Sequence, residues 1–340
     1  MIEYILKRIL LFIPTLLAIT LITFGISRLA PGDPAEMKAG IGQEGTMAAG
    51  GKMQVNEETI KLIRHMWHLD EPIWKQYVLW MNDMVHLDFG NSFIDQRPVM
   101  SKIMERLPIT FTLSLISVIL VYIIAIPIGI YSASHQYSTG DKISGGFLFM
   151  LYSLPDFWIA TMAIIFLCGG DYLALFPSSG IYSMDYSSSW SFLDKILDIG
   201  WHIVLPVIMY TYAGLAYISR QMRGSMLEVI RQDYIRTARA KGLDERKVIY
   251  KHALRNSLIP IITLLAGLLP SLIGGSIVIE TIFSIPGIGQ LGFQALLERD
   301  YPMIMAELTI GAVLTLLGIL ISDILYSVVD PRIVFSKKTV

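Results

Sequence analysis

Six long, apolar and nearly uncharged stretches constrain the fold of this 340-residue chain more than any other feature. They cover residues 9–27, 108–134, 143–170, 199–219, 256–279 and 303–329. A helix that crosses the hydrocarbon core of a bilayer needs about 20 such residues. The composition agrees, because 54% of the residues are hydrophobic and 16% are charged, against about 45–50% and about 25% in soluble domains. The sequence therefore predicts an all-α, polytopic membrane protein with six transmembrane helices, and it excludes most soluble enzymes.

The first apolar stretch has two interpretations. Lys7 and Arg8 precede it, as basic residues precede the apolar core of a cleavable signal peptide. The stretch is longer than such a core usually is, and Leu29-Ala30-Pro31 is a poor cleavage site. We therefore expect an uncleaved transmembrane helix.

Lysine and arginine predict the orientation of the chain. Ten of them lie between Arg220 and Arg255, and with both termini and the short loop holding Lys142 the total on that side is 16 of 27. The short loops of the other side carry only Lys195 and Arg299. Because basic residues accumulate in cytoplasmic loops, both termini and the basic loop are predicted to face the cytoplasm.

The outer loop, residues 30–107, is the largest soluble piece. It opens on the turn cluster Pro31-Gly32-Asp33-Pro34, and a glycine-rich stretch follows at 40–51. Asn56 is a candidate cap for one amphipathic helix, and Pro72 is a candidate start for another. The apolar side of the second helix would hold Ile73, Tyr77, Trp80, Met81 and Met84. These helices would lie on the outer membrane interface, or they would dock an external protein.

Residues with catalytic or metal-binding chemistry are scarce. His65 and His68 lack a third ligand of clear spacing, so no metal site is predicted. Phosphate-binding, zinc-protease and serine-hydrolase motifs are absent from the sequence, and no catalytic residue is predicted. The single cysteine, Cys168, lies in an apolar run and is best read as a small buried hydrophobe.

The basic segment 220–260 has a helical pattern. Met226, Ile230, Tyr234 and Ala238 recur at a spacing of four. Gly242 then ends the helix as a C-terminal glycine would, and Asp244 is a candidate N-cap for a second helix that leads into the fifth span. Such a loop could simply bind anionic lipid headgroups. The small residues beside the glycine turn also suit the close approach of another protein.

These residues resemble a known family. Thr237-Ala238-Arg239-Ala240-Lys241-Gly242, with His252-Ala253-Leu254-Arg255-Asn256 and Pro260, is similar to the "EAA loop" of ATP-binding-cassette importer permeases of the dipeptide, oligopeptide and nickel group. The general pattern begins with Glu where this chain has Arg236. Further stretches resemble that group in the same order, namely 28–34, 87–92, 106–108, 280–289, 299–302 and 330–332.

The resemblance implies a type I importer permease fold and a transport subunit that is not itself an enzyme. In that family a short cytoplasmic helix docks into a groove on an ATPase. The match assigns this coupling role to eight residues: Arg236, Thr237, Ala238, Arg239, Ala240, Lys241, Gly242 and Leu243. The implied partners are a second related permease, two ATPases that bind ATP and Mg, and an external substrate-binding protein. No cofactor is expected in this chain, and no nucleic acid is expected as a partner.

The implied organisation has four parts. A tail with the first transmembrane helix covers residues 1–29, and the outer loop covers 30–107. The permease core with the coupling loop covers 108–330, and a cytoplasmic tail covers 331–340. The location implied for such a chain is the bacterial inner membrane.

Ionisable residues inside spans are functional candidates. Asp156 follows Pro155, which would kink the third span, so Asp156 is a candidate for the translocation path or lies near an interface. Glu280 follows the small-residue run Gly274-Gly275-Ser276 and is a second candidate, with a structural pairing as the alternative.

The cargo is predicted only as a class. The resemblance implies an ATP-driven importer of di- or oligopeptides, and Gly169-Gly170, Leu175-Phe176-Pro177, Trp201-His202 and 329–332 favour the oligopeptide and microcin-uptake branch. Nickel chelates or other small solutes are the alternative within the family. A self-sufficient secondary transporter is the alternative outside it, but the inverted repeat typical of that class is not seen.

Overall fold

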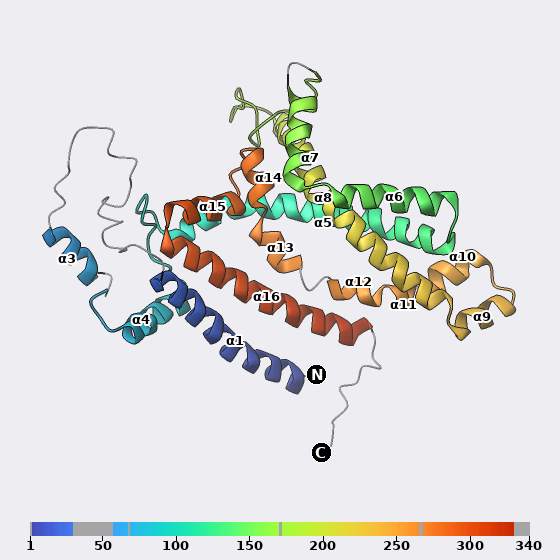
Figure 1. Cartoon of the computed structure of the whole chain (residues 1–340), viewed down its shortest axis with the longest axis horizontal. Coiled ribbons are helices and arrows are strands. Elements are labelled where there is room, and N and C mark those ends of the chain that lie inside the picture. Colours follow the sequence, from blue (N-terminus) through green and yellow to red (C-terminus); the bar gives the residue numbers. More distant parts are fainter. Residues whose placement is uncertain (1, 30–56, 67–68, 170–171, 265–267, 330–340) are drawn as a thin grey trace. The chain divides into compact units, whose positions relative to one another are not determined.

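A computed structural model describes residues 2–29, 57–66, 69–169, 172–264 and 268–329. Within these ranges the regular structure is helical, apart from an isolated antiparallel bridge between Asn91 and Pro98 (Figure 1). The predicted turn at 31–34, the glycine-rich stretch 40–51, the cap at Asn56, His68 and the motif at 330–332 lie outside the described residues.

The chain forms two compact units. The first comprises Met1–Glu105 with Gly292–Val313, and the second comprises Arg106–Leu291 with Leu314–Val340. The longer helices are α1 (Ile2–Leu29), α3 (Glu57–Met66), α4 (Ile73–Val85), α5 (Val99–Ser134), α6 (Thr139–Ser153), α7 (Asp156–Ala163), α8 (Phe192–Ile230), α9 (Asp233–Ala240), α15 (Ile288–Glu298) and α16 (Tyr301–Val329). The shorter ones are η2 (Ile164–Cys168), α10 (Glu245–Lys247), η3 (Val248–Ala253), α11 (Leu254–Ser257), α12 (Ile259–Leu264), α13 (Leu268–Gly274) and α14 (Ile277–Ile282).

Three of the described helices are long and apolar enough to cross a bilayer, namely Ile5–Leu29, Val99–Ser134 and Tyr301–Ile321. The pair Thr139–Ser153 and Asp156–Cys168 makes a fourth candidate if it is one span, and it bends by 94°. Pro155 lies at this bend, as predicted, because proline cannot continue the hydrogen bonding of the preceding helix. The predicted fourth span falls in α8, and the fifth is divided among α12, α13 and α14. The count of six spans therefore stays a prediction.

In the first unit, α4 packs on the C-terminal half of α1. The Tyr77 hydroxyl lies 2.9 Å from Thr20 Oγ1, and the rings of Tyr77 and Trp80 lie 5.4 and 5.8 Å from the ring of Phe24. Trp74 and Val78 of α4 leave their apolar side chains exposed. The predicted helix after Pro72 is thus present. Ile73, which was expected on its packed side, is instead 67% exposed at the first position of the helix.

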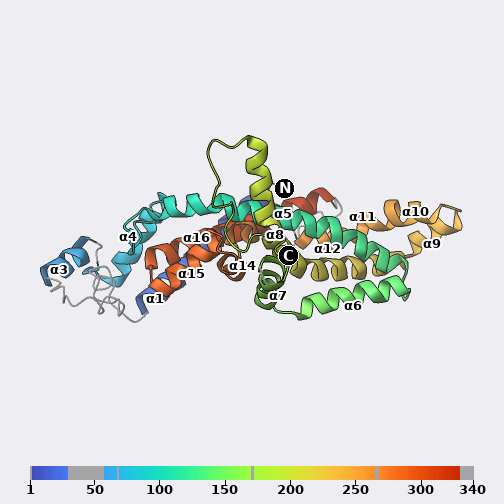
Figure 2. The ribbon, with the colours of Figure 1, turned by 90° about the horizontal axis from the view of Figure 1, so that it is seen from above.

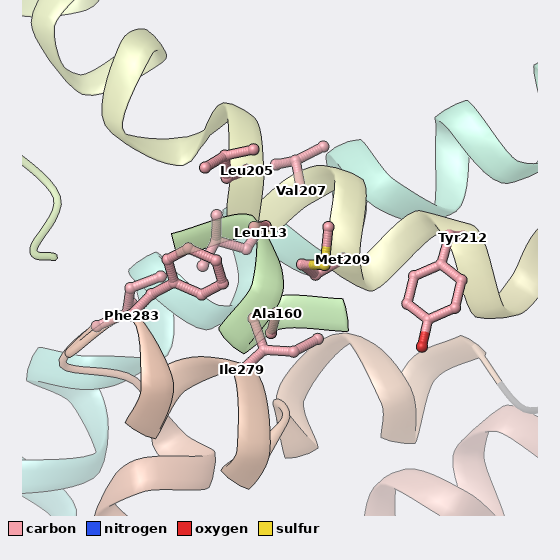
Figure 3. Close-up of a cluster of buried hydrophobic side chains, with 10 residues drawn as sticks. Leu113, Ala160, Leu205, Val207, Met209, Tyr212, Ile279 and Phe283 are labelled. Carbon is pink, nitrogen blue, oxygen red and sulfur yellow. The ribbon is translucent and has the colours of Figure 1, made fainter. Parts of the chain in front are cut away.

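In the second unit, an apolar cluster joins α5, α7, α8 and α14. Figure 3 shows Leu205, Val207, Met209 and Tyr212 of α8 with Leu113, Ala160, Ile279 and Phe283, all buried. This cluster positions the N-terminal end of α7 and the residues around Glu280.

Farther along, α8 approaches α5 and α6 closely. A Cβ atom placed on Gly129 of α5 would lie 2.6 Å from Met222 Cβ and 2.8 Å from the Ser219 carbonyl oxygen, so only glycine fits there. Asp141, near the start of α6, accepts two hydrogen bonds from Arg223 of α8, at 3.0 and 2.9 Å. These contacts fix the C-terminal half of α8, from which the basic loop departs.

Candidate functional site

The basic loop begins with a break in the chain direction. α8 ends at Ile230, Gln232 is extended, and α9 starts at Asp233. An acidic residue in the first turn suits the positive end of the helix dipole. The prediction of one helix reaching Gly242 is therefore wrong at Arg231 and Gln232. The break also shifts the helical phase, so that Ile235 is buried instead of Tyr234.

Gly242 ends α9 in a left-handed conformation, with φ of +75°. The Gly242 N–H donates to the Arg239 carbonyl at 2.9 Å, and the Leu243 N–H donates to the Ala238 carbonyl at 3.4 Å. These two bonds form the Schellman motif, in which a glycine satisfies the last carbonyl groups of a helix. The prediction of Gly242 as a helix C-terminal glycine is confirmed.

An ion pair spans this turn. Arg239 Nε and Nη2 donate to the two carboxylate oxygens of Glu245, at 3.0 and 2.6 Å. These hydrogen bonds hold the pKa of the Glu245 carboxyl below its usual value of 4.5. Because the two side chains are 39% and 60% exposed, the pair contributes less than about 1 kcal/mol to stability. Its two-point geometry instead fixes the end of α9 relative to the start of α10.

The chain then returns through α10, η3, α11 and α12. Asp244 takes the predicted N-cap position, but its side chain makes no capping hydrogen bond. Asn256 Nδ2 donates to the Tyr234 hydroxyl at 2.7 Å and so links α11 to α9. Figures 1 and 2 both show α9 and α10 at the C-terminal end of α8.

One side of α9 rests on the rest of the second unit. Ile235 and Ala238, three residues apart, are buried in an apolar cluster. The other buried members are Ile130 and Ala133 of α5, Met222 and Met226 of α8, and Val248, Ile249, Ala253 and Ile261 of the returning segment. We call this cluster the footing of α9. It leaves the opposite side of α9 and the whole Gly242 turn exposed.

The structure separates the eight predicted coupling residues into two groups. Ala238 is only 8% exposed and belongs to the footing, so its side chain faces this chain's own core. The other seven, Arg236, Thr237, Arg239, Ala240, Lys241, Gly242 and Leu243, are exposed. We call these seven exposed residues the turn surface. Three of its residues are cationic. Arg239 pairs with Glu245, and Arg236 Nη1 lies 3.6 Å from Asp233 Oδ1, so the cations of this surface lie beside acids of the same chain.

The two candidates for the translocation path have different surroundings. Asp156 is exposed at the first position of α7, and its Oδ1 accepts a hydrogen bond from the Tyr212 hydroxyl at 2.5 Å. The same hydroxyl lies 3.3 Å from the Leu154 carbonyl oxygen, the carbonyl that precedes Pro155. Asp156 is therefore both positioned and accessible within this chain.

Glu280, by contrast, is 0% exposed. Its carboxylate accepts hydrogen bonds from the Thr110 and Tyr210 hydroxyls, both at 3.0 Å, and from the Gln290 N–H at 2.8 Å. A Cβ atom on Gly275 or Gly287 would collide with this carboxylate. These contacts support the structural pairing, because three donors already satisfy the buried group.

Several residues of these sites were not predicted. Glu245 and Asn256 hold the turn, and Thr110 and Tyr210 hold Glu280. The role of Glu245 did have a signal in the sequence, because Arg239 and Glu245 are opposite charges that lie three residues before and three residues after the turn glycine. No local signal links Thr110 to Glu280, which is 170 positions away. Among the described residues, no group of three or more His, Cys, Asp or Glu side chains could hold a metal ion.

Comparison with known proteins defines the class of protein. Residues 125–335 match the family "Binding-protein-dependent transport system inner membrane component", and residues 1–114 match "Binding-prot-dependent transport system membrane comp, N-term". The chain belongs to this family. It is a permease subunit and not itself an enzyme, and it is a multi-pass protein of the inner membrane.

Full-length relatives place it more narrowly among peptide-transport permeases. It is 40% identical over 337 residues to the oligopeptide transport system permease protein AppB of Bacillus subtilis, covering 98% of this chain and 99% of that one. It is 38% identical to the dipeptide transport system permease protein DppB of Alkalihalophilus pseudofirmus, with coverage of 98% and 99%. It is also 32% identical, with 99% of each chain covered, to a protein named as a peptidoglycan transport system permease, YejB of Agrobacterium fabrum. The chain is an ATP-binding-cassette transporter permease of the peptide-transport family.

Proposed function

We propose that this chain is the membrane-spanning subunit of an ATP-driven importer of di- or oligopeptides, and that the turn surface receives the movement of an ATPase subunit. The observation that carries the proposal is the α9 turn itself. One side of α9 is buried in the footing, and the exposed side ends in a glycine turn clamped by Arg239 and Glu245. A rigid, exposed projection of this kind is suited to seating in a groove of another subunit.

The proposed contact uses the turn surface. Ala240 and Gly242 allow close approach, whereas Arg236, Arg239 and Lys241 supply positive charge. Ala238 contributes by packing α9 onto the footing, not by touching the partner. The ATPase chains would bind ATP and Mg, and this chain would hold neither.

The proposed assembly contains a second, related permease, two ATPases and an extracytoplasmic binding protein. When ATP closes the ATPases, each seated helix would move with its ATPase and switch the spans between inward-open and outward-open states.

We propose six spans with both termini in the cytoplasm, a type I permease fold, and the four-part division at residues 29, 107 and 330. Asp156 would line the translocation path, because it is exposed at the bend between α6 and α7. Glu280 would have a structural role and would not line the path.

The cargo is proposed to be a peptide because relatives with full coverage carry oligopeptide and dipeptide transport names. The motifs noted above favour oligopeptides. Nickel chelates, or other small solutes of the family, are the alternative cargo. A self-sufficient secondary transporter is disfavoured, because the chain belongs to a family of binding-protein-dependent systems.

The test is a pull-down of the tagged chain in mild detergent, repeated with Gly242→Asp. The new side chain would place bulk and negative charge at the centre of the turn surface. We expect the wild-type chain to retain a P-loop ATPase and a second permease, and the variant to lose the ATPase alone.

Gly180→Asp is the matched control. Gly180 also has a left-handed conformation, with φ of +80°, and its N–H also donates to a carbonyl, that of Phe283, at 2.9 Å. Both variants therefore carry a similar backbone strain, roughly 1–2 kcal/mol, but only Gly242 lies on the turn surface. Retention of the ATPase by Gly242→Asp, or its loss with both variants, would contradict the proposed contact.

A further inference from the structure

The first unit contains a cavity of about 580 Å³ that the coupling mechanism does not use. Its wall comes from the end of α1, the inner side of α4, the loop 86–98 and the start of α16. Three of the stretches that carry the family resemblance meet here, represented by Arg28, by 88–91 and by Tyr301-Pro302. The volume lies in the range of sites for small organic ligands, about 300–1,000 Å³.

The wall is held in place by its own hydrogen bonds. Asp300 is 2% exposed, and its carboxylate accepts from the Ser92 hydroxyl at 2.5 Å and from the Phe93 N–H at 3.0 Å. Asp88 Oδ1 accepts from the Gly90 N–H at 2.9 Å, and this glycine has a φ of +73°. The loop is thus formed independently of any ligand, as preorganised binding sites are.

Gln76 supplies an unused acceptor in this wall. It is only 8% exposed, and it lines the cavity. Its Nε2 donates to the Leu69 and Glu71 carbonyl oxygens, at 3.1 and 2.7 Å, which fixes the orientation of the amide. Its Oε1 accepts no hydrogen bond from any residue in the described part of the chain. A buried acceptor of this kind costs about 1–3 kcal/mol unless a donor reaches it.

The remaining lining groups define the donor. The charged lining residues are two carboxylates, Asp83 and Asp88, and one guanidinium, Arg28, so the charge of the wall favours a cation or a zwitterion over an anion. Five aromatic side chains complete it: Phe24, Trp80, Phe89, Phe93 and Tyr301. Aromatic faces accept both apolar groups and cations. The matching ligand carries an ammonium group, an N–H donor farther along the molecule and an apolar body.

We propose that this cavity binds the amino-terminal end of a short peptide. The α-ammonium group would pair with Asp83, and an apolar first side chain would lie among the aromatic rings. Because Gln76 and Asp83 are seven residues apart on α4, about 10 Å along its axis, a backbone N–H farther along the peptide would donate to Gln76 Oε1. The inference rests on the proposed function for the identity of the cargo, and it adds a subsite at the end of α1 that is outermost in the proposed topology. The charged headgroup of an ethanolamine lipid shares the ammonium group but lacks the backbone amides.

The test is photo-crosslinking of the full chain in lipid nanodiscs with the tripeptide photoleucine-alanine-alanine. We expect adducts, mapped by mass spectrometry, on residues that line the cavity. Unlabelled leucine-alanine-alanine should compete, whereas its N-acetylated form should compete roughly tenfold less, since it lacks the charged donor. Adducts should form equally in nanodiscs of phosphatidylcholine and of phosphatidylethanolamine.

Asp83→Asn should reduce the adducts roughly tenfold, and Asp70→Asn, an exposed acid of the same unit that does not line the cavity, should leave them unchanged. Equal competition by the acetylated peptide, adducts elsewhere in the chain, or equal effects of the two variants would overturn the subsite. Loss of the adducts in phosphatidylethanolamine alone would assign the cavity to the lipid instead. None of these results affects the ATPase pull-down, so failure of the subsite and failure of the proposed function are distinguishable.

Discussion

Arg239 and Glu245 show how single residues shape the proposed contact. Their ion pair is exposed, so it adds little to the free energy of unfolding. It does restrict the Gly242 turn to one geometry, because both guanidinium nitrogens engage both carboxylate oxygens. The pair should therefore matter for binding the ATPase more than for stability.

We expect Glu245→Gln and Arg239→Gln each to weaken ATPase binding about two- to fivefold, corresponding to less than about 1 kcal/mol. The double variant should be no weaker than the Arg239→Gln variant, because each change removes the same interaction. Binding of the purified ATPase to the chain in nanodiscs measures this. Additive losses would mean that the two residues act separately.

The same pair has a defined pH dependence. The pKa of Glu245 is lower in the folded chain than its usual 4.5. Its contribution is therefore present above that value and is lost as the pH falls through the lower, folded pKa. The difference in ATPase affinity between the wild-type chain and Glu245→Gln should accordingly stay constant between about pH 6 and 8.

Residue roles divide into those that sequence could predict and those that it could not. Gly242 was predictable because a helix terminus and its glycine are neighbours in sequence. The burial of Ala238 depends on where the break at Gln232 sets the helical phase, and the spacing of apolar residues did not reveal that break. The enclosure of Glu280 depends on Thr110, Tyr210 and Gln290, which only the folded chain brings together.

At the scale of elements, the long apolar helices were the easiest to predict. α1, α5 and α16 each contain a predicted span, and the bend at Pro155 follows from proline chemistry. The region of the fifth predicted span was harder. Its apolar residues are divided among α12, α13 and α14, and hydropathy alone carries no information on where such helices stop.

The close packing of α5 on α8 makes a prediction about Gly129. We expect Gly129→Ala to lower the stability of the chain by about 1–3 kcal/mol, because the added methyl group meets Met222 Cβ and the Ser219 carbonyl oxygen. Met222→Ala should not rescue it, since that change leaves both of these atoms in place. Thermal unfolding of the detergent-solubilised chain measures the effect.

Gly146→Ala is the matched control for this packing. Gly146 lies in the interior of α6, and a Cβ atom there would have nothing within 4 Å. Alanine should therefore be neutral or stabilising by up to about 1 kcal/mol, as in any open helical position. A loss at Gly146 equal to that at Gly129 would argue against the close contact.

At the scale of the whole molecule, the proposed topology can be tested with single cysteines. The only native cysteine is Cys168, so a Cys168→Ala chain provides the background. In spheroplasts, whose inner membrane is intact, a membrane-impermeant maleimide should label Met184→Cys and should not label Lys241→Cys. In permeabilised cells both cysteines should be labelled. Both positions are exposed in the structure, so the comparison reports the side of the membrane.

Labelling of both cysteines from the same side would contradict the six-span arrangement between these two positions, because a single crossing within α8 is what separates them in the proposed topology. Labelling of Lys241→Cys alone in spheroplasts would invert the orientation that the basic residues predict.

The footing of α9 has a mechanical consequence. A loop tethered only at its ends can pull on the spans but goes slack when it is pushed. α9 instead stands on buried side chains of α5, α8 and the returning segment, and packed protein interiors are nearly incompressible. α9 should therefore transmit a push as well as a pull. In the proposed assembly, both the closing and the opening of the ATPases could then move the membrane helices.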